Sequence, residues 1–373
     1  MKIQTQRPQR RTAATTAAVT VAVSSLILAG CSNSEGGDGE TTGEGNYELS
    51  NTEGELTGEG ASSQQKAIEQ FGVAYSSAVP GATLSYNATG SGSGQTQFIA
   101  DQVDFAGSDS ALDEEQAPQA AERCGGNDAW HLPLVVGPVA VAYNLEGVDD
   151  LNLSVETVAK IFKGDIKNWN DEAIAAENEG VDLPDQPIDV LYRSEESGTS
   201  DNFQKFLNVA TDGEWEGEGK TFPTDVGSGA QGSSGVADQV AQTNGSITYV
   251  ESGFATASDL GIANIDFGAG PTELSSETVN KALDSVEFSG EGNDLVVDSE
   301  ALFGTEEEGA YPLALTTYEI VCSAGYDEET AGRVKDFMYT VLDSQDEEYE
   351  ESGYIPLSGE FKEKLETAIG ELE

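Results

Sequence analysis

Hydrophobic residues along the chain follow two spacings, one typical of strands and one typical of helices. Short apolar runs at 82–86, 135–143 and 311–321 predict strands, whereas apolar residues three or four positions apart at 155–162 and 329–342 predict amphipathic helices. Strands and helices alternate through most of the chain, which favours an α/β fold with mainly parallel pairing. The folded part is longer than a typical single core, so we expect two lobes.

One turn between a predicted strand and a predicted helix combines a cation with two hydroxyl groups. Arg193 follows an apolar run, and Ser197, Gly198 and Thr199 lead into a helical pattern. The first backbone N–H groups of a helix have no partner within it, so this turn can direct amides and hydroxyls at an oxyanion. Arg193 adds a planar cation that suits two oxygens at once. Alternatively, these residues only cap the helix.

Two further turns are rich in glycine and serine. Ser62 and Ser63 precede a helical pattern and are candidate N-cap residues. Ser91 lies in a glycine-rich turn that lacks the Gly-Lys-Ser/Thr ending of a phosphate-binding Walker loop. Asp109 ends the strand-like stretch that follows. A flexible loop could have the same glycine-rich composition, so neither turn identifies a site by itself.

The N-terminus has the features of a secretory signal. Basic residues are followed by an uncharged run up to Gly30 and then by Cys31. The junction Leu28-Ala-Gly-Cys31 resembles a bacterial lipobox, so we expect residues 1–30 to be removed and Cys31 to carry lipid; the alternative is a soluble secreted protein. Residues 31–57 are mostly Gly, Glu, Ser, Thr and Asn, which predicts a flexible acidic tether.

The composition excludes several classes of function. The formal net charge is −51, which disfavours nucleic-acid binding and means that an anion site must act at short range. Three arginines lie beyond the signal, and one of them is Arg193. His131 is the single histidine, and no metal-ligand spacing is present, so we expect no metal, no cofactor and no histidine-based catalysis.

Two cysteines remain if Cys31 carries lipid. In an oxidising compartment outside the cytoplasm, Cys124 and Cys322 are expected to form a disulfide, although two buried free thiols would also fit.

Taken in order, the turns resemble the periplasmic phosphate-binding protein of the bacterial phosphate-specific ABC importer. The resemblance covers nearly the whole folded region, and its strength lies in the order and spacing of several short fragments. These fragments are Gly58-Glu-Gly-Ala-Ser62, Gly90-Ser91, Phe98-Ile-Ala100, Val103-Asp-Phe-Ala-Gly-Ser-Asp109, Asp165-Ile-Lys-Asn-Trp-Asn-Asp-Glu-Ala173, Arg193-Ser-Glu-Glu-Ser-Gly-Thr199 and Gly245-Ser-Ile-Thr-Tyr-Val-Glu251.

The resemblance implies a two-lobed periplasmic-binding-protein fold with a ligand cleft between the lobes. We expect residues 58–141 and 313–373 in the first lobe and 142–312 in the second, with crossings near 139–143 and 311–315. The residues expected at the phosphate are Ser62, Ser63, Ser91, Asp109, Arg193, Ser197, Gly198 and Thr199. The chain departs from the family pattern at Ser63, where an aromatic residue is usual, and at Glu195-Glu196, which replace Asp-Gly. We expect Glu195 to hold Arg193 in place.

The implied function is non-enzymatic binding of inorganic phosphate for delivery to membrane permease subunits. The protein would act as a monomer anchored by lipid to the outer face of the cell membrane. Asp109 can accept a hydrogen bond from the proton that phosphate retains at neutral pH, whereas sulfate has no proton to donate. The alternatives are a secreted phosphatase, a binding protein for another oxyanion, and a structural lipoprotein.

Overall fold

The computed structural model describes residues 46–373 except 224, 285 and 306. The predicted signal segment, Cys31 and the start of the predicted tether lie outside these residues. No helix in the described part of the chain is long and apolar enough to span a membrane.

Helices and strands alternate through the described residues, as the hydrophobic spacing predicts. The strands are β1 (Gly54–Gly60), β2 (Ala82–Asn87), β3 (Phe105–Ser108), β4 (Ala129–Asn144), β5 (Asn152–Ser154), β6 (Asp189–Arg193), β7 (Ser228–Ala230), β8 (Ser246–Glu251), β9 (Gly261–Ile262), β10 (Asn264–Asp266), β11 (Pro271–Thr272) and β12 (Ala314–Cys322). The helices are α1 (Gln65–Ala78), α2 (Ser91–Ile99), α3 (Gln116–Arg123), α4 (Val155–Lys163), α5 (Glu172–Glu177), α6 (Gly198–Ala210), α7 (Gly232–Ala241), α8 (Ser252–Ala257), α9 (Ser276–Leu283), α10 (Ser299–Phe303), α11 (Glu328–Asp343), α12 (Glu347–Glu351) and α13 (Gly359–Gly370).

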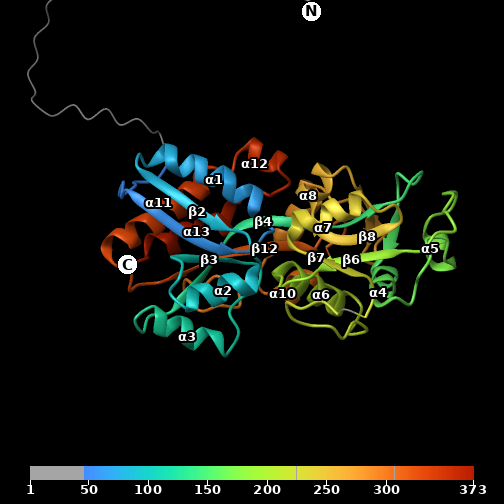
Figure 1. The fold of residues 1–373 in the computed structure, drawn as a ribbon, viewed down its shortest axis with the longest axis horizontal. Coiled ribbons are helices and arrows are strands. Elements are labelled where there is room, and N and C mark those ends of the chain that lie inside the picture. Colours follow the sequence, from blue (N-terminus) through green and yellow to red (C-terminus); the bar gives the residue numbers. More distant parts are fainter. Residues whose placement is uncertain (1–45, 224, 285, 306) are drawn as a thin grey trace, which may run out of the picture. The chain divides into compact units, whose positions relative to one another are not determined.

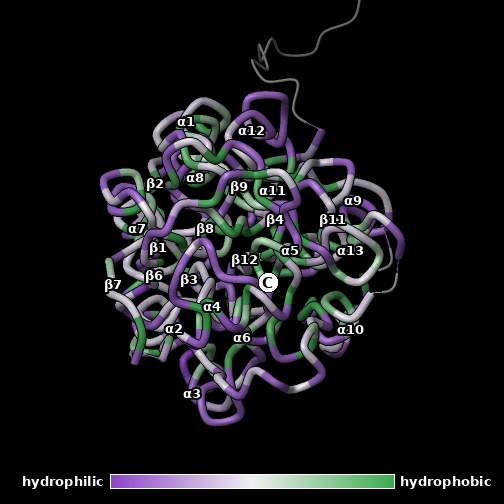
Figure 2. Tube along the Cα trace, turned by 90° about the vertical axis from the view of Figure 1, so that its right-hand side faces the viewer, coloured by the Kyte–Doolittle hydropathy of each residue, from purple (hydrophilic) through white to green (hydrophobic). Residues whose placement is uncertain are grey.

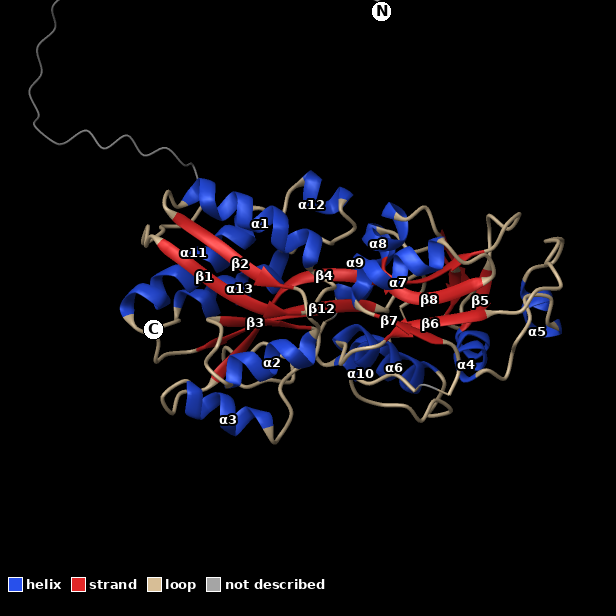
Figure 3. Cartoon of the chain, viewed as in Figure 1, coloured by secondary structure: helices blue, strands red, loops and turns tan. Residues whose placement is uncertain are grey.

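The main sheet of the described chain has the strand order β2-β1-β3-β12-β4-β8-β6-β7, with β9 also paired to β4. Figure 1 shows β1, β2 and β3 on one side and β6, β7 and β8 on the other, and Figure 3 shows helices covering the strands on both sides. We call these two parts the first lobe and the second lobe. The α/β fold is therefore confirmed, and the outer strands of both lobes pair in parallel.

Two long strands, β4 and β12, connect the lobes. Residues 129–138 of β4 pair with β12, and residues 139–144 pair with β8 of the second lobe. Pro138 lies at this change of partner, and Pro312 lies two residues before the start of β12. Since proline has no N–H group, the crossing has fewer backbone donors than an ordinary strand pair.

The pairing at the crossing is antiparallel, so the sheet as a whole is mixed. The strands of the two lobes have their carboxyl ends toward each other and therefore run in opposite directions. The continuous strand β4 can follow the direction of only one lobe, and it runs antiparallel to β8. Ligands of open α/β sheets bind at carboxyl ends of strands, so this arrangement places one potential site between the lobes.

Hydrophobic residues concentrate along the central strands, and polar residues dominate the outer loops and helix faces (Figure 2). In the second lobe, Phe203 stacks on Tyr249 with ring centroids 4.5 Å apart, and Phe162 meets Phe203 edge to face at 4.9 Å. In the first lobe, Phe105 and Phe337 pack at 5.5 Å. These aromatic contacts pack helices and strands of the same lobe against each other.

The prediction of a flexible tether is wrong for residues 46–57. Residues 46–57 are packed against the first lobe, and β1 begins at Gly54. Tyr47 stacks on Tyr339 of α11 at 4.6 Å, its hydroxyl donates to Glu366, and the backbone N–H of Ser50 donates to buried Asp336. An aromatic stack and hydrogen bonds with residues far away in the sequence hold this segment on the first lobe. Local amino-acid composition carries no information about such contacts.

The predicted boundary of the second lobe also needs correction. Residues 287–297 were expected in the second lobe, but they contact the first lobe. Phe288 packs edge to face on Phe361 of α13 at 5.2 Å, and Asp294 accepts from the backbone N–H of His131 at 2.7 Å. The ring of His131 also lies 2.7 Å from Asp294 through Nδ1, while Nε2 accepts from the N–H of Leu112. His131 therefore has a structural role, because both of its ring nitrogens are engaged in hydrogen bonds.

Cys124 and Cys322 form a disulfide between the end of α3 and the end of β12. Their sequence separation is 198 residues, so the bond closes a loop that contains the whole second lobe. Both cysteines are buried in a small apolar cluster of the first lobe with Phe98 and Ile320.

Glu319 is a buried acid within β12. It is 1% exposed, and both of its carboxylate oxygens lack a hydrogen-bond partner among the described residues. Its strand partner is Gly107, beside which lie the amide of Gln64 and the hydroxyl of Tyr86. Burial, with a further contribution from the charge of Asp109, raises the pKa of Glu319 to about 8.

We predict that Glu319→Gln stabilises the protein at alkaline pH. The pKa of a glutamate is about 4.3 in an unfolded chain, so between that pH and about 8 the folded state binds the extra proton and stability falls as pH rises. The amide removes this loss and should raise the free energy of unfolding by about 1 kcal/mol or more at pH 8.5. Urea unfolding at pH 5 and 8.5 measures the effect. Exposed Glu329→Gln is the control, and an equal pH response of the Glu319→Gln variant and the wild type would contradict the prediction.

Candidate anion-binding site

The carboxyl ends of four strands meet between the two lobes. β1 and β3 of the first lobe lead to Ser62 and Asp109, while β6 and β8 of the second lobe end at Arg193 and Glu251. All four residues are buried. The structure therefore brings residues from distant parts of the chain into one polar cluster.

Arg193 is the centre of the contacts in this cluster and is 3% exposed. Its Nη2 donates to Ser62 Oγ of the first lobe at 2.7 Å, and its Nη1 donates to Thr199 Oγ1 and Ser233 Oγ at 3.1 Å each. Nε donates to Glu195 Oε1 at 2.7 Å, and Nη2 makes a second contact with the same oxygen. Glu195 thus contacts two nitrogens of the guanidinium, which fits the expectation that it holds Arg193 in place.

The aromatic core of the second lobe fixes the backbone at Arg193. The hydroxyl of Tyr249 accepts from the N–H of Arg193 at 3.3 Å and shares a hydrogen bond with Ser200 at 2.7 Å. Because Tyr249 also stacks on Phe203, apolar packing of β8 and α6 determines where the cation lies.

Asp109 has two oxygens in different environments. Oδ1 accepts from Ser63 Oγ at 2.6 Å and from Thr317 Oγ1 at 2.7 Å, whereas Oδ2 has only a long contact of 3.4 Å with Ser91 Oγ among the described residues. Burial and, after it, the charge of Glu251 raise the pKa of Asp109 to about 6, although the hydroxyl donors and Arg193 act in the opposite direction. Oδ2 is therefore the carboxylate oxygen best placed to accept another hydrogen bond.

The starts of α2 and α6 meet at Ser91 and Gly198. Ser91 Oγ accepts from the N–H groups of Gly198 at 3.2 Å and of Asp109 at 3.1 Å. A Cβ atom at position 198 would lie 2.5 Å from both Asp109 Cβ and Ser91 Oγ, which requires glycine at this close approach. The glycine allows two helix starts from different lobes to come into contact.

Two groups of predicted site hydroxyls have different positions from those expected. Ser197 is the N-cap of α6, and its Oγ accepts from the N–H of Ser200 at 3.2 Å, so its hydroxyl serves the helix. The prediction that Ser62 and Ser63 cap α1 is wrong, since Gln64 is the N-cap and has no side-chain capping bond. Their hydroxyls point into the cluster because Arg193 and Asp109 provide stronger, charge-assisted partners.

Three residues of the cluster were not in the predicted set. Ser233 starts α7 in the second lobe, and its glycine-rich turn could have indicated it. Glu251 ends β8, within a fragment that carries the family resemblance. Thr317 lies inside β12, where the register with β4 shifts between residues 317 and 318. Such a bulge redirects a side chain, and no local pattern in the sequence indicates it.

Further contacts join the lobes around the cluster. Ser110 Oγ donates to Asp201 at 2.6 Å, and the amide of Asn202 donates to the carbonyl of Asp109, also at 2.6 Å. On the side of α1, Lys66 donates to the carbonyl of Gly253 at 2.6 Å. The lobes are therefore closed on each other in this structure.

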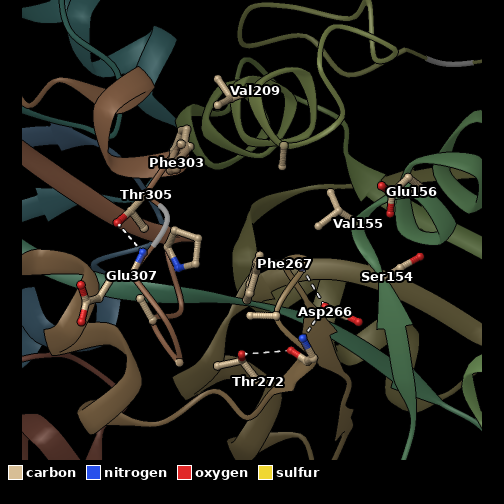
Figure 4. Close-up of a pocket in the computed structure, with 18 residues that line it drawn as sticks. Ser154, Val155, Glu156, Val209, Asp266, Phe267, Thr272, Phe303, Thr305 and Glu307 are labelled. Atoms are coloured by element: carbon tan, nitrogen blue, oxygen red, sulfur yellow. Dashed lines mark hydrogen bonds between the residues drawn. The ribbon is translucent and has the colours of Figure 1, made fainter.

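A larger pocket lies elsewhere, in the second lobe. It has a volume of about 490 Å³ and is bounded by residues around 154–156, 266–272 and 303–312 (Figure 4). The Asp266 carboxylate there accepts from N–H groups of its own loop. A smaller pocket of about 200 Å³ borders Asp109 and Asn202. Pocket volume therefore does not identify the candidate site. The polar cluster is the candidate because its hydrogen-bond donors and acceptors are buried.

The cluster has the chemistry of an anion site. It combines helix-start amides, neutral hydroxyls and one guanidinium, all removed from solvent. No group of described residues could hold a metal ion.

Comparison with known proteins places the chain in a family. A model of the PBP superfamily domain matches residues 38–344. The phosphate-binding protein PstS2 of Mycobacterium bovis is 44% identical over 358 residues, which cover 94% of this chain and 96% of the relative. The phosphate-binding protein PstS of Xylella fastidiosa is 30% identical over 317 residues, which cover 83% and 84%.

Solved structures share the fold. A high affinity periplasmic phosphate-binding protein bound with phosphate has a TM-score of 0.70 at 24% identity and covers 84% of this chain and 93% of its own. The phosphate-binding protein of Stenotrophomonas maltophilia has a TM-score of 0.65 at 22% identity, with the same coverage. The chain therefore belongs to the PBP superfamily and, within it, to the family of bacterial PstS-type phosphate-binding proteins.

Proposed function

We propose that the protein binds inorganic phosphate outside the cytoplasm and delivers it to the permease subunits of an ABC importer. The observation that carries this proposal is that a buried guanidinium, Arg193, and a buried carboxylate, Asp109, lie in one cluster of hydroxyls and helix starts. The family membership and the names of the relatives support the same ligand. The proposed role is non-enzymatic.

The donors proposed for the phosphate oxygens come from both lobes. The first lobe offers Ser62, Ser63 and Ser91, and the second lobe offers Arg193 and the start of α6 at Gly198 and Thr199. In the closed structure many of these groups bond to one another, so a ligand exchanges existing hydrogen bonds for new ones. Contacts at hydrogen-bond distance in a buried cleft outweigh the screened field of the distant acidic surface.

Asp109 gives the proposed site its selectivity. A carboxylate accepts hydrogen bonds and donates none. Oδ2 can therefore accept a hydrogen bond from the O–H group that phosphate retains. Sulfate would place an unprotonated oxygen against the carboxylate. Sites that require a hydrogen bond discriminate more strongly than sites that measure size.

We propose that release of phosphate follows a hinge motion of the lobes. The strand crossings at 138–139 and 312–314 are the covalent links that would bend, while the contacts of Arg193 and Asn202 with the opposite lobe would break.

The proposed location depends on Cys31, which lies outside the described residues. Lipid on Cys31 would keep the carrier at the outer face of the membrane and raise its effective concentration near the permease. The expected monomeric state suits a carrier whose ligand site lies within one chain.

We predict that Arg193→Ala weakens phosphate binding by at least about 100-fold, because the site loses its guanidinium while the half-buried Glu195 loses its cationic partner. Arg193→Lys keeps the charge without the planar fork and should be intermediate. Isothermal titration calorimetry with inorganic phosphate measures both, with Arg333→Ala as the control for general loss of a cation. Wild-type affinity in folded Arg193→Ala would remove Arg193 from the site.

We predict that Asp109→Asn narrows the preference for phosphate over sulfate by about tenfold or more, since the amide can donate to sulfate. In the wild type, lowering the pH from 8 to 5 should narrow the same preference, because Asp109, with a pKa of about 6, becomes protonated over this range and gains a donor. Competition titrations at both pH values test this. Selectivity that is unchanged in the variant and across the pH range would contradict the role of Asp109.

We predict that Cys31→Ala moves the protein from the membrane fraction to the soluble fraction of the producing bacterium. The purified variant should bind phosphate like the wild type, because the binding cluster lies in the folded region. Membrane fractionation with immunodetection gives the distribution. Membrane retention of the variant would show that another feature anchors the chain.

The proposed non-enzymatic role has its own test. Hydrolysis of p-nitrophenyl phosphate by the wild type would contradict a non-enzymatic role.

A further inference from the structure

Glu251 is a second buried carboxylate in the cluster. It is the last residue of β8 and is 1% exposed. Its Oε1 accepts from Thr199 Oγ1 at 2.7 Å, while its Oε2 is buried and has no hydrogen-bond partner among the described residues. A buried acceptor without a hydrogen-bond donor destabilises the folded protein, so we expect a bound ligand to provide a donor to Oε2.

The contact with Glu251 changes what Thr199 can do. A hydroxyl has one hydrogen to donate, and Thr199 uses it on Glu251 while accepting from Arg193 at 3.1 Å. In this arrangement the Thr199 side chain connects the guanidinium to Glu251. Only its backbone N–H remains for an anion.

The cluster holds more negative than positive charge. Asp109 and Glu251 are close enough that the charge of Glu251 is, after burial, the largest influence raising the pKa of Asp109. The positive charge of Arg193 is already paired with Glu195, which also accepts from the N–H of Gly232. One oxygen of Glu195 also has no hydrogen-bond partner within the described part of the chain, but the guanidinium of Arg193 compensates the charge of that carboxylate.

Tyr354 is a further titratable group near Glu251. Burial raises the pKa of Tyr354 well above its usual value, and the charge of Glu251 adds to this effect. Its hydroxyl donates to the carbonyl of Ser63 at 2.8 Å, so its hydrogen is already used. Tyr354 thus leaves Oε2 of Glu251 without a donor.

We infer that Glu251 is a second proton acceptor of the site, so that phosphate binds together with one additional proton. The inference rests on the proposed function. Two poorly satisfied carboxylate oxygens, Asp109 Oδ2 and Glu251 Oε2, need two O–H donors. Above pH 8 free phosphate carries a single proton. The second proton comes from solvent and lies between the ligand and the two carboxylates, and the added charge is then one negative unit rather than two.

The experiment is calorimetric titration of the wild-type protein with inorganic phosphate at pH 8.5 in two buffers of different ionisation enthalpy. The dependence of the observed heat on the buffer gives the number of protons taken up. We expect about one proton per phosphate, and therefore an affinity that falls about tenfold per pH unit above pH 8. No proton uptake at pH 8.5 would overturn the inference while leaving phosphate binding intact.

Glu251→Gln tests the assignment to this residue. The amide can still accept from Thr199 and replaces the unpartnered oxygen with a donor. We expect proton uptake near zero and a flattened pH dependence. Glu251→Asp, which keeps the carboxylate, should retain the uptake. Uptake of about one proton in folded Glu251→Gln would overturn the inference.

Glu59→Gln is the matched control outside the site. Glu59 is also buried in the first lobe, where it accepts from the hydroxyls of Thr89 and Ser93. The phosphate affinity and the proton uptake of the Glu59→Gln variant should equal those of the wild type. Failure of the wild type to bind phosphate at any pH would instead contradict the proposed function, and the two failures are thereby distinguished.

Discussion

The contacts of the Arg193 guanidinium are the interaction on which the site depends. A buried cation needs compensation, and Arg193 obtains it from Glu195 in its own lobe and from the hydroxyl of Ser62 in the other. The guanidinium therefore serves two purposes at once. It is the positive charge of the proposed anion site, and it joins the two lobes. In a chain with a net charge of −51, this local pairing lets an anion site exist inside an acidic protein.

Strand direction explains why the polar groups meet. The carboxyl ends of both sets of parallel strands face each other, so each strand delivers the first residues of its following turn to the same place. The helix starts at Ser91 and Gly198 then approach closely because position 198 has no side chain. The chemistry of the cluster is thus a consequence of sheet topology combined with turns rich in serine and glycine.

Sequence reasoning found the residues whose signal is local. Arg193, Ser91 and Asp109 lie at strand ends or in a glycine-rich turn, which apolar periodicity and glycine content indicate. The family resemblance then added Ser91 and Asp109 to the expected site. Thr317 was missed because it lies within a strand, and its direction depends on a register shift against β4. The packing of residues 46–57 and 287–297 on the first lobe was missed for a related reason. Both segments are ordered by contacts with residues far away in the chain, which local composition does not encode.

The prolines at the strand crossing affect the energetics of lobe motion. Pro138 and Pro312 remove backbone donors at the point where β4 changes its pairing partner. Bending there sacrifices few ladder hydrogen bonds, so the backbone contributes little resistance. In the proposed hinge motion, side chains between the lobes would then govern the relative populations of open and closed molecules, and a small ligand that contacts both lobes would shift these populations through its differential affinity alone.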